Sequence, residues 1–280
     1  MGNKFILTLS CKDKAGIVAK VSGLLFEIGG FVIQSSQFGD ESTDTFFMRV
    51  EFECDRNLTE ITDLFSPIGV DYSMNWQMTD IDKKPKILLA VTKASHCLVD
   101  LLHKSSIGAL GAEIVGVISN REDLKGLTEK FDKEFIYLPI KQSKALQEKQ
   151  IVKVFEEKNA ELLVLARYMQ ILSNETCEKL QGRAINIHHS FLPSFKGANP
   201  YRQAYERGVK IIGATAHYVT SDLDEGPIIE QEVTRVDHSE KPNDLMLKGQ
   251  DTENRVLFNA VKWHLERRVI LNGSKTVIFK

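Results

Sequence analysis

Apolar side chains in the first 80 residues of the chain follow two different periods. Short runs in which apolar residues dominate or alternate with polar ones predict β-strands at residues 4–10, 29–38, 43–54 and 71–80. Between these runs, residues 14–30 and 58–69 repeat apolar positions at the spacing of an amphipathic helix. The order βαββαβ predicts a split βαβ arrangement, a ferredoxin-like antiparallel sheet with two helices on one face.

Beyond residue 85 the predicted strands change in character, because they are short and almost wholly apolar. They lie at residues 86–92, 112–120, 135–139, 161–166 and 184–189. Helical segments such as residues 143–159 separate them. Continuously apolar strands alternating with helices predict a Rossmann-like, mostly parallel sheet that is covered on both faces. In such sheets ligands bind beyond the carboxyl ends of the strands.

A charged stretch with no apolar period follows Met78 and contains Pro85, which is typical of a linker. We therefore expect two unequal α/β domains, residues 1–82 and residues 83–280. The length of 280 residues and the 42% hydrophobic content fit two ordinary globular cores.

Charge and cysteine content narrow the function classes. The formal net charge is −2, without a basic block, so we expect no nucleic-acid partner. The N-terminal segment lacks a signal-peptide core, and no apolar run is long enough to span a membrane, so we expect no membrane association and a cytoplasmic location. The cysteines are far apart in the sequence and predict free thiols in a reducing compartment: Cys11, Cys54, Cys97 and Cys177.

Two polar residues stand at the end of the predicted strand 184–189, where Ile187 separates Asn186 from His188. Positions i and i+2 of a strand point to the same side, so both side chains would face one point. An amide N–H and an imidazole N–H at such a point can stabilise the oxyanion of a carbonyl under attack, and the imidazole can transfer a proton. The pattern predicts acyl chemistry. A structural histidine at a strand end is the alternative.

The residues that follow extend this motif. Ser190-Phe191-Leu192-Pro193 and Gly197 come next, and His217-Tyr218-Val219 precedes Leu223-Asp224-Glu225-Gly226-Pro227. Together with Asn186-Ile187-His188, these segments resemble the glycinamide ribonucleotide and methionyl-tRNA formyltransferases, and the resemblance covers residues 85–280. It implies that Asn186, His188 and Asp224 form the catalytic group. It also implies that a formyl carbon on N10 of tetrahydrofolate is the reacting centre.

The same resemblance implies that the folate substrate contacts the segment after the strand 161–166. Met169, Ile171 and Leu172 are the expected contacts, and packing of these side chains in the core is the alternative. We expect no cofactor and no metal, because the formyl group is already an activated acyl group and the sequence shows no ligand cluster.

The acceptor of the formyl group is expected to be water. No glycine lies between Lys93 and Leu98, where formyltransferases for glycinamide ribonucleotide bind a phosphate, and no basic C-terminal domain follows the last helix. Ser95-His96-Cys97, the pair His188-His189 and the tail 273–279 resemble the formyltetrahydrofolate deformylases. The implied reaction is hydrolysis of 10-formyltetrahydrofolate, which supplies formate for purine synthesis. Formyl transfer to a small amine and a non-catalytic amino-acid sensor are the alternatives.

Residues 1–82 resemble the ACT regulatory module, on the motif that begins at Cys11. The resemblance implies a small effector, glycine or methionine, at Asp13, Ala15, Gly16 and Ile17, and a homo-oligomer formed through these domains. The alternative is that Gly16 eases a turn and Asp13 caps the helix.

Four further residues complete the expected substrate site: His96, His189, Gly197 and His217. His96 lies at a carboxyl strand end by the same geometry as His188. For the neighbouring Cys97, packing in the core is the alternative. His217 is equally suited to lining the crevice or to a structural role, and His189 has solvent exposure as its alternative.

Overall fold

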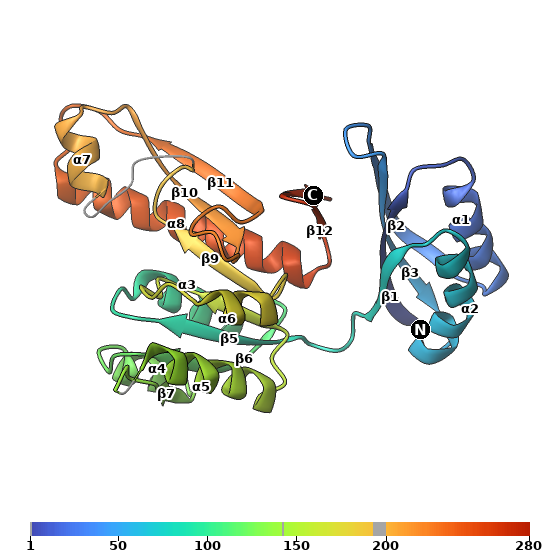
Figure 1. Cartoon of the computed structure of the whole chain (residues 1–280), viewed down its shortest axis with the longest axis horizontal. Coiled ribbons are helices and arrows are strands. Elements are labelled where there is room, and N and C mark those ends of the chain that lie inside the picture. The colour runs from blue at the N-terminus through green and yellow to red at the C-terminus, as the bar shows by residue number, and fades with distance from the viewer. Residues whose placement is uncertain (1, 142, 193–199) are drawn as a thin grey trace. The chain divides into compact units, whose positions relative to one another are not determined.

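The computed structural model describes residues 2–141, 143–192 and 200–280. The chain forms two compact units (Figure 1). The first contains residues 1–84 with 266–272 and 276–280, and the second contains residues 85–265 with 273–275. The tail after residue 265 belongs to the second of the two domains expected from the sequence, whereas most of it groups with the first unit.

The first unit has the predicted βαββαβ order. Its elements are β1 (Asn3–Lys12), α1 (Ile17–Glu27), β2 (Phe31–Asp40), β3 (Thr45–Cys54), α2 (Leu58–Asp71) and β4 (Asn75–Asp80). The strands pair antiparallel in the order β2-β3-β1-β4. The split βαβ arrangement predicted from the sequence is therefore confirmed.

One face of this sheet packs against both helices, as Figure 1 shows. Alternate residues of β1, from Phe5 to Cys11, are buried with Ile17 of α1 and Phe65 of α2. This alternation follows from the two-residue period of a strand with one buried face. Asn57 and Glu60 form a capping box that fixes the start of α2.

Arg49 explains why the tail belongs to the first unit. The side chain is 2% exposed, and its guanidinium donates to the carbonyl oxygen of Glu266 at 3.1 Å and to Glu51 at 3.1 Å. Asn272 donates to Asp40 at 2.7 Å. These contacts join the tail to strands β2 and β3. The tail itself forms a hairpin of β12 (Val269–Asn272) and β13 (Lys275–Ile278).

The second unit contains the predicted apolar strands. Its elements are β5 (Lys86–Val91), α3 (His96–Ser106), β6 (Glu113–Ser119), α4 (Lys125–Glu129), β7 (Phe135–Tyr137), α5 (Lys144–Glu157), β8 (Leu162–Leu165), α6 (Asn174–Lys179), β9 (Ala184–His188), α7 (Pro200–Glu206), β10 (Ile211–Tyr218), β11 (Ile228–Arg235) and α8 (Pro242–Leu265). The sheet order is β11-β10-β9-β8-β5-β6-β7. Strands β5 to β9 pair in parallel, whereas β10 and β11 run antiparallel. The predicted mostly parallel sheet is confirmed.

The order of the strands places a crevice beyond the carboxyl ends of the parallel strands. From β5 the chain builds outward through β6 and β7 and then returns to β8 on the other side of β5. The loops after β5 and β8 therefore diverge, and ligands of open α/β sheets bind at such a point. Helices α5 and α6 pack with Leu88 and Ala90 on one face, and α8 packs along β9, β10 and β11.

Across the described ranges, no helix combines the length and the apolar character that crossing a bilayer requires. Even α8, with 24 residues, carries charged side chains along its length.

Gly69 in α2 provides a test of the packing in the first unit. A Cβ atom at this position would overlap the indole Nε1 of Trp76. We expect Gly69→Ala to lower the free energy of unfolding by about 1–3 kcal/mol, as overpacking of a filled core does. Gly23→Ala in α1 is the control, because a Cβ there meets no atom within 4 Å and alanine favours the helix by roughly 0.5–1 kcal/mol. Urea unfolding of both variants measures the difference, and equal stability would contradict the packing of Trp76 on Gly69.

Candidate active site

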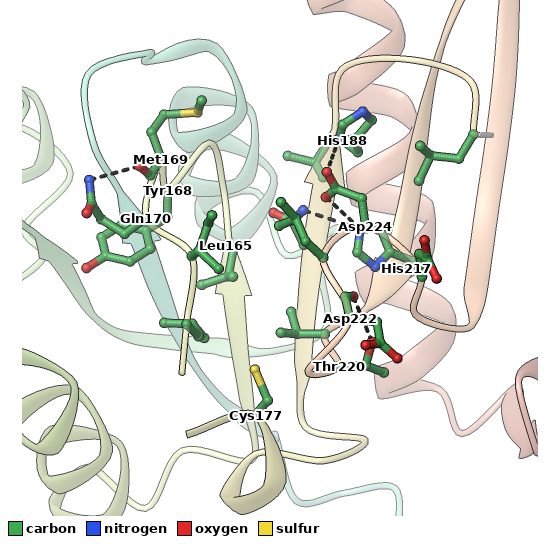
Figure 2. Close-up of a pocket in the computed structure, with 18 of the residues that line it drawn as sticks. Leu165, Tyr168, Met169, Gln170, Cys177, His188, His217, Thr220, Asp222 and Asp224 are labelled. Atoms are coloured by element: carbon green, nitrogen blue, oxygen red, sulfur yellow. Dashed lines mark hydrogen bonds and ion pairs between the residues drawn. The ribbon is translucent and has the colours of Figure 1, made fainter. Parts of the chain in front are cut away.

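A cavity of about 750 Å³ opens in the second unit beyond the carboxyl ends of β8 and β9. Its walls come from three segments: the residues after β8, the end of β9 with its following loop, and the loop after β10. Figure 2 shows the β8 loop with Met169 and Gln170 on one side, and His188, His217 and Asp224 on the other. This is the position that the strand order predicts for a ligand.

Strand register brings the polar residues of this cavity together. Asn186 lies in β9 opposite Leu165 of β8 and opposite His217 of β10. Asn186 and His188 both line the cavity, while Ile187 between them is 3% exposed. The i and i+2 spacing thus places both side chains at the cavity.

Asp224 connects the two histidines (Figure 2). Its Oδ2 lies 3.2 Å from Nδ1 of His188, and its Oδ1 lies 3.7 Å from Nε2 of His217. His217 Nδ1 lies 2.9 Å from the carbonyl oxygen of Tyr218, to which it can only donate, so this nitrogen carries a proton. His217 Nε2 is 3.3 Å from the amide nitrogen of Asn186. When the His217 ring is neutral, its Nε2 accepts a hydrogen bond from the Asn186 amide. When the ring is charged, Nε2 carries a proton and can donate to Asp224.

The loop that carries Asp224 is held tightly against β10. Asp224 has a left-handed φ of +59°, a conformation that aspartate adopts more readily than most residues. A Cβ atom on Gly226 would overlap the carbonyl oxygen of Tyr218, so only glycine fits there. The backbone N–H of Tyr218 donates to the carbonyl oxygen of Pro227 at 2.9 Å. These contacts fix the position of the Asp224 carboxylate.

The two histidines also set the charge of this carboxylate. Hydrogen bonding from His188, and then from His217, holds the pKa of Asp224 well below its usual range, although partial burial opposes the change. Asp224 is therefore ionised at neutral pH. As an anion it can only accept hydrogen bonds, so His188 presents a protonated Nδ1 to it.

His189 follows the catalytic candidates and also lines the cavity. Its ring stacks on His188 with centroids 5.2 Å apart. Burial, followed by the nearby charge of Arg167, lowers the pKa of His189 to about 4. The imidazole is therefore neutral at physiological pH.

The expected folate contacts lie in the β8 loop and all line the cavity. Met169 is 57% exposed and Ile171 is 56% exposed, so packing in the core does not explain these two side chains, whereas Leu172 is 6% exposed. The backbone N–H of Met169 donates to Thr92 Oγ1 at 3.0 Å, which ties this loop to the end of β5. The sequence did not predict the role of Thr92, because the residues next to it do not show that its hydroxyl accepts a hydrogen bond from a loop 77 positions away.

His96 is not among the described residues that line the cavity. At the start of α3, its Nε2 lies 2.9 Å from Glu253 of α8, which is 1% exposed. Glu253 also accepts from Tyr201 at 2.8 Å and lies 3.5 Å from Arg167 Nε. Sequence reasoning missed Glu253, because helix periodicity does not distinguish it from a surface carboxylate.

Ligand atoms of His96, Cys97 and Glu253 lie within 4.8 Å of one another. One imidazole, one thiol and one carboxylate are possible metal ligands. Burial, followed by the charge of Glu253, raises the pKa of the Cys97 thiol well above its usual value. Arg167 Nε lies 3.5 Å from Glu253, so this carboxylate already faces one positive charge.

The remaining expected site residues lie elsewhere. Gly197 lies outside the described residues. In the first unit, Gly16 has a φ of +95° at the N-terminus of α1, so its conformational freedom eases the turn. No side chain caps α1, so the idea that Asp13 caps this helix is wrong, and Ile17 is 2% exposed.

Arg167 also lines the cavity, although sequence reasoning missed it. The signal was present, because Arg167 follows an apolar strand as a polar residue, in the same way that His188 ends β9.

Comparisons with known proteins agree with this geometry. A family model described as formyl transferase matches residues 85–261. A formyltetrahydrofolate deformylase from Corynebacterium sp. (strain P-1) is 46% identical over 281 residues, which cover 99% of this chain and 98% of the relative. The chain belongs to the formyltetrahydrofolate deformylase family. The resemblance drawn from the sequence motifs is thereby confirmed.

Solved structures of relatives extend this assignment. The crystal structure of formyltetrahydrofolate deformylase from Burkholderia mallei ATCC 23344 has a TM-score of 0.96 and 49% identity, covering 99% of this chain and 100% of that one. Glycinamide ribonucleotide transformylase 1 from Symbiobacterium toebii has a TM-score of 0.66 and 27% identity, covering 70% of this chain and 95% of that one. The match to a deformylase therefore extends over nearly the whole chain.

The lowered pKa of His189 predicts how the stability of this deformylase-family protein depends on pH. The ordinary value is 6.5 and the folded value about 4, so the unfolded chain binds a proton that the folded protein excludes. The contribution of neutral His189 is present above pH 6.5 and is lost as the pH falls towards 4. We expect His189→Gln to reduce this loss, measured by urea unfolding across the interval.

Exposed His103 on α3 is the matched control, and His103→Gln should leave the pH dependence unchanged. An identical pH dependence in the wild type and in His189→Gln would contradict the buried neutral state of His189.

Proposed function

We propose that this protein hydrolyses 10-formyltetrahydrofolate to formate and tetrahydrofolate. The observation that carries the proposal is the pairing of His188 with Asp224 beside Asn186 in the cavity wall, in a chain that matches deformylases over nearly its full length. The formate formed in this way supplies purine synthesis and balances one-carbon pools. Transfer of formyl to a small amine and a non-catalytic sensor role are not favoured.

Asn186 and His188 are proposed to stabilise the tetrahedral intermediate. Water attacks the formyl carbon, and the carbonyl oxygen gains negative charge. In its neutral form, His217 accepts at Nε2 from one N–H of the Asn186 amide at 3.3 Å, which leaves the second N–H of that amide for the oxyanion. Orienting this amide is the role we assign to His217.

His188 is proposed to receive the proton from the attacking water. Asp224 is a weak base, because its pKa is held well below the usual range. The carboxylate instead fixes the Nδ1 proton of His188 and stabilises the charged imidazolium. Among the described residues, His188 Nε2 has no hydrogen-bond partner, so this nitrogen is available to water or to the reacting oxygen. The proton then passes to N10 as the C–N bond breaks.

The folate ring system is proposed to lie against the β8 loop. Met169 and Ile171 present exposed apolar surface there, while Leu172 is buried in the core cluster of the second unit. An apolar wall with few polar groups is typical of a site for a large planar ligand. His189 and Gly197 are further proposed contacts, and His96 acts through Glu253. The proposed chemistry requires neither a cofactor nor a metal.

The first unit is proposed to bind glycine or methionine and to mediate a homo-oligomer. The proposed effector site comprises Asp13, Ala15, Gly16 and Ile17, with the turn at Gly16 exposing backbone groups. Strand β2 is an edge of the sheet and carries exposed apolar side chains, among them Phe31 at 71%. An unpaired apolar edge supports pairing with a second copy. The four cysteines are free and buried, which supports a reducing, cytoplasmic location.

Release of formate without any added acceptor is the test of the proposed reaction. We expect the wild-type protein to convert 10-formyltetrahydrofolate to equal amounts of formate and tetrahydrofolate. Asp224→Asn should lower turnover by about 10²–10⁴-fold with little change in folate binding, because the charge that orients and stabilises His188 is lost.

Asp222→Asn is the control, since Asp222 lies in the same loop and, among the described residues, His188 pairs with Asp224 and not with Asp222. An equal loss of turnover in both variants would exclude the assigned pairing. Absence of formate from the wild-type reaction would exclude the hydrolase.

The edge strand gives a separate test of the homo-oligomer. We expect Phe31→Lys to shift the protein to a smaller species, because a charged side chain on an edge opposes strand pairing. Phe26→Lys is the control, since Phe26 is 85% exposed but lies on α1, away from the edge. Light scattering after size exclusion measures the mass, and an unchanged mass in Phe31→Lys would exclude β2 as the interface.

A further inference from the structure

Arg167 is the only lysine or arginine among the described residues that line the cavity. Strands β8 and β9 pair in parallel with Leu165 opposite Asn186. Arg167 follows the end of β8 by two residues, and His188 is the last residue of β9. Arg167 has a left-handed φ of +66°, which turns the chain away from the sheet at this position. Arg167 thus belongs to the wall of the cavity that also holds Asn186 and His188.

Glu253 supports this guanidinium from behind. Its Oε1 accepts from Tyr201 at 2.8 Å, and its Oε2 lies 2.9 Å from His96 Nε2, which can donate to it. Burial opposes ionisation of Glu253, but hydrogen bonding from His96 and the charge of Arg167 hold its pKa below the ordinary value. The carboxylate is anionic, and each of its oxygens already has one hydrogen-bond partner, Tyr201 or His96.

Arg167 therefore keeps hydrogen-bonding capacity for a ligand. Its Nε lies 3.5 Å from Glu253 and makes no hydrogen bond to any described residue, although this nitrogen is buried. A guanidinium has five N–H donors in a planar fork, and the side chain retains 16% exposure at the cavity. A buried donor without a partner indicates a group that the folded chain alone does not supply.

A planar carboxylate is the ligand that matches a guanidinium fork. We propose that Arg167 binds the carboxylate of formate as it forms and leaves, which rests on the hydrolysis proposed above. In that reaction the water oxygen forms a bond to the formyl carbon, and the C–N10 bond breaks. One proton of water goes to N10, the other is released, and formate departs as an anion. The anion forms next to Asn186 and His188, in the cavity that Arg167 also lines.

The substrate carries a second source of carboxylates in its glutamyl tail. This tail is separated from N10 by the rigid aminobenzoyl group, so it cannot lie beside the formyl carbon. Arg167 follows the strand that pairs with β9 and lines the same cavity as Asn186 and His188, which favours formate over the tail. The two sources predict different kinetic effects, since loss of a tail contact raises KM and loss of a formate contact weakens product inhibition.

Inhibition by sodium formate, at an ionic strength held constant with sodium chloride, tests the proposal. We expect Arg167→Gln to raise the inhibition constant of formate by about tenfold or more, the effect of losing one charge-assisted interaction. Arg167→Lys should fall between the wild type and Arg167→Gln, because an ammonium keeps the charge without the fork. Arg202→Gln is the control, since Arg202 is exposed on α7 and pairs with Glu206, and it should leave the constant unchanged.

Line broadening of ¹³C-formate by the protein without folate measures the same contact independently of catalysis. Broadening in the wild type that is reduced in Arg167→Gln supports the formate site even if the catalysed reaction proves to be another one. Wild-type protein that neither broadens formate nor is inhibited by it would overturn the proposal. A tenfold increase in KM with unchanged formate inhibition would overturn it as well and would assign Arg167 to the tail. Thermal melting confirms that each variant is folded. If Arg167→Gln does not fold, Arg167→Lys still tests the proposal, because it should weaken formate inhibition as well.

Discussion

The pairing of His188 with Asp224 depends on how closely the loop after β10 returns to its own strand. Asp224 takes a left-handed backbone conformation, and Gly226 lies so close to the carbonyl oxygen of Tyr218 that a Cβ atom does not fit. This packing holds the carboxylate between His188 and His217 at 3.2 and 3.7 Å. The charge state of Asp224, the tautomer of His188 and the orientation of Asn186 all follow from the position of that one carboxylate.

A second carboxylate, that of the fully buried Glu253, plays a comparable part. Each carboxylate lies against two nitrogen-containing side chains, and each is kept ionised by its neighbours despite burial. Asp224 faces the cavity with imidazoles, whereas Glu253 is 1% exposed and supports Arg167, a permanent cation. His189 remains neutral, because its partial burial and the charge of Arg167 both disfavour a further cation. The site thus combines fixed charges with one neutral ring.

The sequence alone predicts the elements that have a periodic apolar pattern and the polar residues that stand at strand ends. The βαββαβ order and the apolar strands of the second unit follow from periodicity, and Asn186, His188 and Asp224 follow from a motif. Contacts between distant segments are not predictable in this way. Glu253 meets His96 across 157 positions, and no local pattern distinguishes it from an exposed glutamate. Likewise, the tail joins the first unit through a backbone carbonyl at Glu266, a group that every residue has.

The motif Leu223-Asp224-Glu225-Gly226-Pro227 is then a physical requirement rather than a label. Aspartate is needed at 224 because its short side chain tolerates a left-handed φ and still reaches both histidines, whereas glutamate would place its carboxylate one methylene further on. Glycine is needed at 226 by the approach of the backbone, and the carbonyl oxygen of Pro227 accepts from Tyr218 to close the turn. Because Tyr218 follows His217 directly, the same turn fixes the ring that orients Asn186. One short loop therefore sets the positions of the acid, the imidazoles and the amide together.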